Sequence, residues 1–176
     1  MTWWNCCGKM QTPESLDMQF NKMEELKAAL SAGENIIYET NSPEETHQLG
    51  LALGRLSNPG QVYTLVGDLG VGKTVFTQGF AAGLGVIGPV NSPTFTIVQV
   101  YEEGRMPFYH FDVYRIGDVE EMEEIGYEDM FYGEGACLIE WANLIEEILP
   151  DSYVEITIEK DLKKGFEYRK ITIAVK

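Results

Sequence analysis

The residues best suited to chemistry form the run Gly67-Asp68-Leu69-Gly70-Val71-Gly72-Lys73-Thr74. The run fits the phosphate-binding loop pattern G-x-x-x-x-G-K-[ST], in which glycines let backbone N–H groups approach a phosphate without a Cβ in the way. Lys73, expected to face solvent, would supply a mobile cation for the β- and γ-phosphates of a nucleotide, and the Thr74 hydroxyl can ligate Mg²⁺. The alternative is a structural glycine turn followed by a surface lysine, which the complete pattern disfavours.

Hydrolysis also needs a carboxylate to hold Mg²⁺ and a group to orient water. Glu140 follows the apolar run 136–139, which has the form of a Walker-B strand ending beside the phosphate loop. A strand-terminating surface glutamate is the alternative. Asp112 is the second candidate, because strand alternation would place His110 and Asp112 on one face of segment 108–114 and the aromatic residues on the other. These two could equally form a structural hydrogen-bonded pair, and His110 alone is interpreted as structural.

Two further positions are ambiguous from spacing alone. Thr94, in Ser92-Pro93-Thr94, can serve either as a switch threonine that senses the γ-phosphate or as a turn cap. Trp141 is either a core residue or a stacking surface near the nucleotide.

Only two arginines, Arg105 and Arg115, lie between positions 75 and 159. This scarcity disfavours a small-molecule kinase and indicates an ATPase that is slow until a partner completes its site.

The elements that must position these residues alternate between strands and helices. A strand over 63–66 and a helix over 75–84 flank the phosphate loop, which is the context that makes the pattern a site. Upstream, the pattern predicts an irregular segment 1–11, a helix over 13–32, a strand at 36–38 and a helix from 43 to about 56. Downstream it predicts strands at 95–101, 107–114 and 136–139, helical turns at 118–125 and 143–149, and a hairpin of 153–158 with 168–175. The short link between the first two of these strands makes them antiparallel, so the fold class is α/β with a mixed sheet.

Length and composition indicate one domain with one core, at 176 residues. No run of 18 apolar residues exists, so no transmembrane helix is expected, and Met1–Met10 lacks the basic start and apolar stretch of a signal peptide. The cysteines are Cys6, Cys7 and Cys137, without a C-x-x-C spacing. They predict a cytoplasmic protein without a cysteine metal site.

The net charge of −15, from 28 acidic and 13 basic residues, disfavours direct, extensive binding of DNA or RNA. Acidic residues are concentrated between positions 102 and 134, where a solvated helix face is the usual meaning of such a run. Basic residues collect near the C-terminus at Lys160, Lys163, Lys164, Arg169 and Lys170. They indicate either a solvated hairpin turn or a small patch for a polyanion or an acidic partner.

Four ordered motifs together resemble one family. They are the phosphate loop 67–74, Ser92-Pro93-Thr94-Phe95-Thr96, His110-Phe111-Asp112-Val113-Tyr114-Arg115 and Ile139-Glu140-Trp141. In these motifs the chain is similar to the TsaE (YjeE) family, the bacterial ATPases of tRNA threonylcarbamoyladenosine synthesis, over about residues 36–175. Residues 1–35 precede the usual family start, and Ala142 follows Glu-Trp where many relatives have proline.

The resemblance implies a P-loop NTPase-like three-layer fold with a mixed central sheet, in which 36–176 form the ATPase domain and 1–35 an extension. It implies ATP and Mg²⁺ as cofactors, a cytoplasmic location, and action with TsaD and TsaB. The partners would hold the tRNA, so tRNA contact is indirect, with no membrane and no direct DNA contact. Two alternatives stay open: a nucleotide-gated assembly switch with incidental hydrolysis, and a small-molecule kinase.

The resemblance also assigns roles residue by residue. It implies that Lys73 and Thr74 bind phosphate and Mg²⁺, that Glu140 supplies a carboxylate at Mg²⁺, and that Asp112 is needed for activity. Thr94 falls in the switch-like segment. Two residues, Trp141 and Asn143, are expected near the nucleotide.

Overall fold

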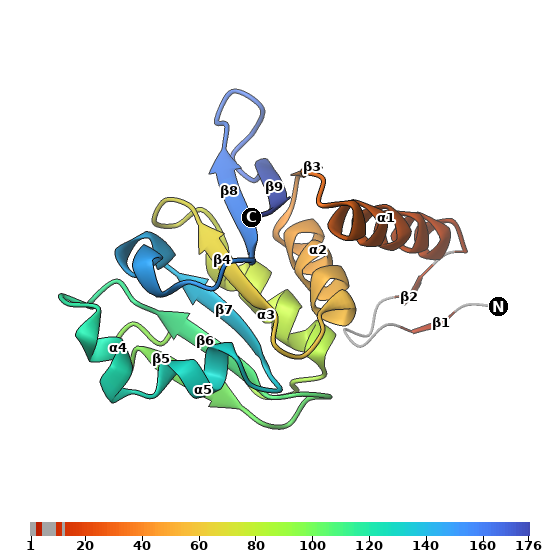
Figure 1. The fold of residues 1–176 in the computed structure, drawn as a ribbon. Helices are drawn as coiled ribbons and strands as arrows, with labels where there is room; N and C mark the ends of the chain where they lie inside the picture. Colours follow the sequence, from red (N-terminus) through yellow and green to blue (C-terminus); the bar gives the residue numbers. More distant parts are fainter. Residues whose placement is uncertain (1–2, 5–9, 12) are drawn as a thin grey trace.

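A seven-stranded mixed sheet runs through the computed structural model, which describes residues 3–4, 10–11 and 13–176, with side chains from residue 21 onward (Figure 1). The strand order is β3-β9-β8-β4-β7-β6-β5. The four inner strands β8, β4, β7 and β6 are parallel, whereas β5 pairs antiparallel with β6, and β9 pairs antiparallel with both β8 and β3. The predicted mixed α/β sheet is therefore confirmed. The strands are β3 (Ile36–Thr40), β4 (Val62–Val66), β5 (Val98–Tyr101), β6 (Phe108–Asp112), β7 (Ala136–Glu140), β8 (Val154–Lys160) and β9 (Arg169–Val175).

Helices cover both faces of the sheet and make it the middle of three layers. On one face, α2 (Pro43–Leu56) and α3 (Lys73–Leu84) pack on Tyr63, Leu65 and Leu138. On the other face, α4 (Glu120–Glu124) and α5 (Tyr127–Phe131) join two 3-10 turns, η1 (Ala142–Leu144) and η2 (Glu146–Ile148), over Val62 and Ile139. The central strands β4, β6 and β7 thus bury residues of their two faces in two separate apolar clusters, as a period of two requires.

Helices α2 and α3 approach each other closely beside the phosphate loop. A Cβ at Gly79 would collide with the backbone carbonyl of His47, so only glycine permits this spacing. At the start of α2, the Ser42 hydroxyl accepts a hydrogen bond from the Glu45 N–H at 3.2 Å, which is the predicted N-cap. This close packing holds the middle of α3, the helix that begins at Lys73, against α2.

Several local expectations differ from the structure. Strand β5 begins at Val98 rather than Phe95, because the N–H groups of Thr96 and Ile97 bond to the Pro93 carbonyl and form a tight turn. Helix α5 was not predicted, and the helical turns expected over 143–149 are two short 3-10 turns. Within segment 1–11, which is expected to be irregular, β1 (Trp3–Trp4) pairs with β2 (Met10–Gln11). The predicted roles of Cys6 and Cys7 fall outside the described residues.

Helix α1 (Pro13–Ala32) precedes β3 and lies at the edge of the molecule next to α2 (Figure 1). Leu26 is fully buried in the cluster under α2 and α3, Leu30 packs against that cluster, and the Tyr38 hydroxyl donates to the Lys22 carbonyl at 3.3 Å. These contacts dock the second half of α1 on the sheet. None of the helices in the described part of the chain is both long and apolar enough to cross a membrane.

Leu26→Ala is expected to lower the free energy of unfolding by about 2 to 5 kcal/mol, because it leaves a cavity in a closed cluster. Chemical denaturation of this variant, beside Lys27→Ala on the exposed face of the same helix, measures the effect. Deletion of residues 1–34 should cost at least as much, whereas deletion of 1–11 should leave folding intact. Equal stability of Leu26→Ala and the wild type would mean that α1 is not docked in solution.

Candidate nucleotide site at the carboxyl edge of the sheet

The phosphate loop connects the end of β4 to the start of α3, as the sequence predicts. Gly67 has φ 157°, and a Cβ there would come within 2.7 Å of the Ile158 carbonyl oxygen and 2.8 Å of Val71. Gly72, at φ 107°, caps α3 in a left-handed conformation that a side chain would strain. These two glycines let the backbone wrap tightly in front of the α3 N-terminus, where unpaired N–H groups and the helix dipole favour an anion.

Lys73 is buried rather than solvent-facing, so that expectation is wrong. Its side-chain Nζ donates to the Gly67 carbonyl at 2.8 Å and to the Asp68 carbonyl at 3.2 Å, and the residue is 8% exposed. The loop carbonyls satisfy the ammonium group locally, which explains its burial. Thr74, the next residue, is exposed in the first turn of α3, and Leu69 contributes only backbone because its side chain is 87% exposed.

Trp141 brings an aromatic ring to the loop. The ring lies with its centroid 5.1 Å from the Lys73 Nζ, in cation–π geometry, and 5.0 Å from the centroid of the Tyr114 ring. Trp141 has φ 64°, a left-handed conformation that is uncommon for a bulky residue and concentrates at functional sites. The half-buried ring lies at the phosphate-loop lysine and also packs against the apolar cluster that contains Ala142 and Ile145, so both roles left open by the sequence remain.

Asp112 is a buried hydrogen-bond acceptor at the end of β6. Its Oδ2 accepts from the Ser92 and Thr94 hydroxyls, each at 2.6 Å, and its Oδ1 accepts from the Tyr114 N–H at 3.2 Å. The residue is 3% exposed, so these charge-assisted bonds replace the water it has lost. Asp112 therefore anchors the segment that carries Thr94 and fixes that segment to the sheet.

Glu140 lies beside Asp112 in the register of the parallel strands β6 and β7. It is 4% exposed, so the alternative of a surface glutamate is wrong. Its Oε1 is 3.0 Å from His110 Nε2. His110 thus pairs with Glu140 and not with Asp112. Phe108 shares the face of His110 and stacks on its ring, so the expected segregation of the aromatic residues is also wrong.

Arg169 is a site residue that the sequence reasoning missed. Its Nε donates to the Val71 carbonyl of the phosphate loop at 2.6 Å, and one terminal nitrogen donates to the carbonyls of Phe166 and Tyr168. Sequence separation hides this contact, because Arg169 follows the loop by almost one hundred positions. The sequence does show a basic residue at the start of the last strand. That residue points to the phosphate loop only once the strand order β9-β8-β4 is known, because the loop follows β4.

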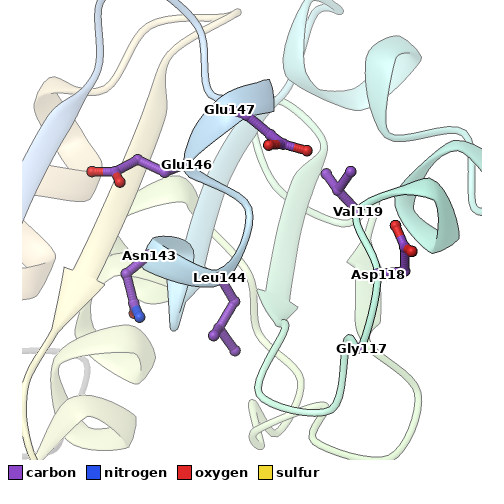
Figure 2. Close-up of a pocket in the computed structure, with 7 residues that line it drawn as sticks. All are labelled: Gly117, Asp118, Val119, Asn143, Leu144, Glu146 and Glu147. Atoms are coloured by element: carbon purple, nitrogen blue, oxygen red, sulfur yellow. The ribbon is translucent and has the colours of Figure 1, made fainter.

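Asn143 lies on η1, two positions after Trp141, and its expected place near the nucleotide stays a prediction. It lines a hollow of about 640 Å³ between the segment before α4 and the two 3-10 turns, and Figure 2 shows Asn143 and Leu144 on η1, with Glu146 and Glu147 on η2. Asp118, Glu146 and Glu147 make the hollow acidic. Such a surface repels phosphate, so the anionic part of a nucleotide fits the phosphate loop and not this hollow.

The donors at the loop fit a magnesium ion. The Thr74 hydroxyl and the Glu140 carboxylate are hard oxygen ligands at the ends of neighbouring elements, and a nucleotide's phosphate oxygens would add others. Within residues 3–4, 10–11 and 13–176, no group of three or more His, Cys, Asp and Glu side chains forms a metal site by itself. This arrangement suits a cation that the phosphate oxygens of a bound nucleotide would help to hold.

A three-layer mixed sheet with this loop between a parallel strand and a helix defines a P-loop NTPase-like α/β protein. The family model "Threonylcarbamoyl adenosine biosynthesis protein TsaE" matches residues 40–171, and the chain belongs to that family. It is similar to the tRNA threonylcarbamoyladenosine biosynthesis protein TsaE of Bacillus subtilis, at 49% identity over 77% of this chain and 82% of that protein. The protein of the same name from Treponema pallidum is 41% identical over 77% of this chain and 97% of that protein. The crystal structure of YdiB from Bacillus subtilis superposes with a TM-score of 0.70, at 42% identity, over 81% of this chain and 87% of that one.

Proposed function

We propose that this protein binds and hydrolyses Mg²⁺–ATP in support of tRNA threonylcarbamoyladenosine synthesis, acting with TsaB and TsaD. One observation carries the proposal: the phosphate-loop lysine lies against Trp141, the residue that follows Glu140, and Glu140 lies beside Asp112 in the register of β6 and β7. The names of the family and of its relatives supply the biological context. Such a role places the protein in the cytoplasm with its tRNA, which the partners would hold.

The proposed roles follow from the contacts of each residue. Backbone N–H groups of the loop and the ammonium of Lys73 bind the β- and γ-phosphates, while Thr74 and Glu140 would hold Mg²⁺. Bound Mg²⁺ supplies charge neutralisation on the phosphate oxygens. Asp112 holds the Thr94 hydroxyl at the edge of the site, so that the switch-like segment can respond to a nucleotide.

Slow turnover without partners is expected because Arg105, Arg115 and Arg169 are already engaged in other contacts, and the remaining arginine, Arg55, lies in the last turn of α2. A terminal nitrogen of Arg105 donates to the carbonyls of Gly54 and Ser57 at 2.6 Å each, at the end of α2. The guanidinium of Arg115 lies 4.4 Å from the Phe95 ring centroid, and Arg169 donates to the Val71 carbonyl of the phosphate loop and to the carbonyls of Phe166 and Tyr168. A partner would then have to supply or free a cation for the transition state.

Phosphate release from ATP, measured with and without TsaB–TsaD from the same source, tests the proposal. Stimulation by the pair is the expected result. A phosphorylated small molecule without net phosphate release would instead indicate a kinase. Nucleotide-dependent assembly with unchanged turnover would indicate the gated switch.

The basic β8–β9 turn is the proposed contact for an acidic partner surface. Lys164 is already bound to Glu39 at 2.6 Å, and this bond raises the pKa of the Lys164 ammonium and lowers that of the Glu39 carboxyl. Lys170 likewise pairs with Glu159 at 3.3 Å. Lys160 and Lys163 are therefore the better choices for a charge reversal, because changing Lys164 would also break a contact with β3.

Reversing Lys160 and Lys163 to Glu is expected to weaken association with TsaB–TsaD roughly tenfold at low salt, with basal turnover unchanged. The difference should shrink as salt rises, because exposed charges are screened. Reversing Lys22 and Lys27 on α1 changes the net charge equally and serves as the control. Equal weakening by both pairs of substitutions would mean that only overall charge matters and that the docking surface lies elsewhere.

A further inference from the structure

We propose that His110 is a positioning residue, whose imidazole holds the Glu140 carboxylate in the orientation that binds the metal of a metal–nucleotide complex. The inference rests on the proposed function and concerns the same site. It replaces the interpretation of His110 as a purely structural residue. The argument uses the contact between the two side chains, the hydrogen-bonding state of the imidazole and the packing of its ring.

The contact between the two side chains is short and shielded from water. His110 Nε2 lies 3.0 Å from Glu140 Oε1, with the two side chains 0% and 5% exposed. In the β6–β7 register His110 is opposite Leu138, so it reaches Glu140 diagonally on the same face of the sheet. His110 is the only hydrogen-bond partner of the Glu140 side chain among the described residues. One carboxylate oxygen is thus fixed by the protein, and Oε2 is left for the site.

The second imidazole nitrogen indicates which atom carries the proton. His110 Nδ1 is buried and has no hydrogen-bond partner within the described part of the chain. A proton on Nδ1 would leave a donor unsatisfied in the interior, which costs more than a bare lone pair. A proton on Nε2 therefore fits the surroundings best, and Nε2–H donates to Glu140. A donor aimed at a ligating carboxylate is the arrangement that commonly orients metal ligands in proteins.

The ring itself has little freedom to move. Phe108 is fully buried and stacks on His110 with ring planes 9° apart and centroids 6.0 Å apart. Because His110 lies in the middle of β6, which pairs antiparallel with β5 and parallel with β7, its backbone is fixed as well. A rigid donor of this kind limits the Glu140 carboxylate to one orientation. Metal binding then costs less conformational entropy, because the carboxylate is already ordered.

Three substitutions separate positioning from simple packing. His110→Phe keeps a planar ring for the Phe108 stack but removes the donor. His110→Gln places an amide N–H near the position of Nε2, whereas the shorter His110→Asn cannot reach Glu140. Thr64→Val is the matched control, because Thr64 is a buried residue of β4 whose hydroxyl, like His110 Nδ1, has no partner in the described structure.

The experiment measures Mn²⁺ binding to the protein–ADP complex by electron paramagnetic resonance, and metal-free ADP binding by calorimetry. His110→Phe and His110→Asn are expected to weaken Mn²⁺ binding by about 10- to 100-fold, with metal-free ADP affinity within about twofold of wild type. His110→Gln should retain most of the Mn²⁺ affinity, and Thr64→Val all of it. Should His110→Phe fail to fold, the difference in Mn²⁺ affinity between His110→Gln and His110→Asn still tests whether the hydrogen bond to Glu140 matters.

Wild-type Mn²⁺ affinity in the Phe or Asn variant would overturn the inference. Equal losses of Mn²⁺ affinity and of metal-free ADP affinity would also overturn it, because a purely structural role of His110 would weaken both kinds of binding. Failure of the wild-type protein to bind ADP at all would instead contradict the proposed function, so the two ideas fail by different measurements.

Discussion

Lys73→Ala is expected to weaken ATP binding by about 100-fold or more, because it removes the loop's own cation from the β- and γ-phosphates. Hydrogen bonds to charged groups contribute about 1.5 to 3 kcal/mol each, and Lys73 would make at least two. The Nζ now bonds to the Gly67 and Asp68 carbonyls, so the variant also loses two local contacts and a small fall in melting temperature should accompany the loss. Calorimetric titration with ATP measures the affinity.

Lys170→Ala is the appropriate control for this substitution. It removes the same charge from an exposed ion pair with Glu159 on the neighbouring strand, far from the loop lysine in sequence. Its ATP affinity should match that of the wild type. Unchanged affinity in Lys73→Ala would remove the basis for assigning 67–74 as the phosphate site.

Glu140→Gln is expected to reduce ATP turnover by about 100- to 1000-fold while ATP affinity changes only a few-fold. The amide keeps the shape of the side chain, and its oxygen can still accept from His110 Nε2, so the local geometry survives. What disappears is the negative charge that, on the proposed function, would hold Mg²⁺ and help to orient the attacking water. Steady-state phosphate release at saturating Mg²⁺, together with calorimetry, separates turnover from binding.

Asp112→Asn is the informative companion to Glu140→Gln. Asp112 Oδ2 accepts from two hydroxyls, so the amide variant frees part of the Thr94 segment as well as removing a charge. Full turnover by Glu140→Gln, with none in Asp112→Asn, would identify Asp112 as the essential carboxylate instead.

The sequence could predict the phosphate loop and the order of the elements from α1 to β9 except for α5, because both depend on local sequence patterns. The glycine spacing, the Ser42 cap and the apolar run before Glu140 each have a local physical cause. The mixed sheet followed from the short link between two strands near positions 101 and 107. Family motifs then added the expected roles of Thr94 and Trp141.

Contacts that depend on strand register could not be predicted in this way. The pairing of His110 with Glu140 requires knowing that β6 and β7 are parallel neighbours, offset so that the two side chains meet diagonally. The burial of Lys73 depends on where the loop carbonyls point, and the turn at Ile97 depends on bonds to Pro93. Each of these is set by tertiary geometry, which local periodicity does not encode.

The bond from Arg169 to the Val71 carbonyl has a thermodynamic consequence. It joins the β8–β9 turn directly to the phosphate loop, so a ligand that shifts the turn and a ligand that orders the loop act on one shared element. Linkage is reciprocal: any factor by which one ligand changes the affinity for the other must operate equally in the opposite direction. A macromolecule that bound the turn more tightly in the presence of nucleotide would, by the same factor, raise the affinity of the protein for that nucleotide.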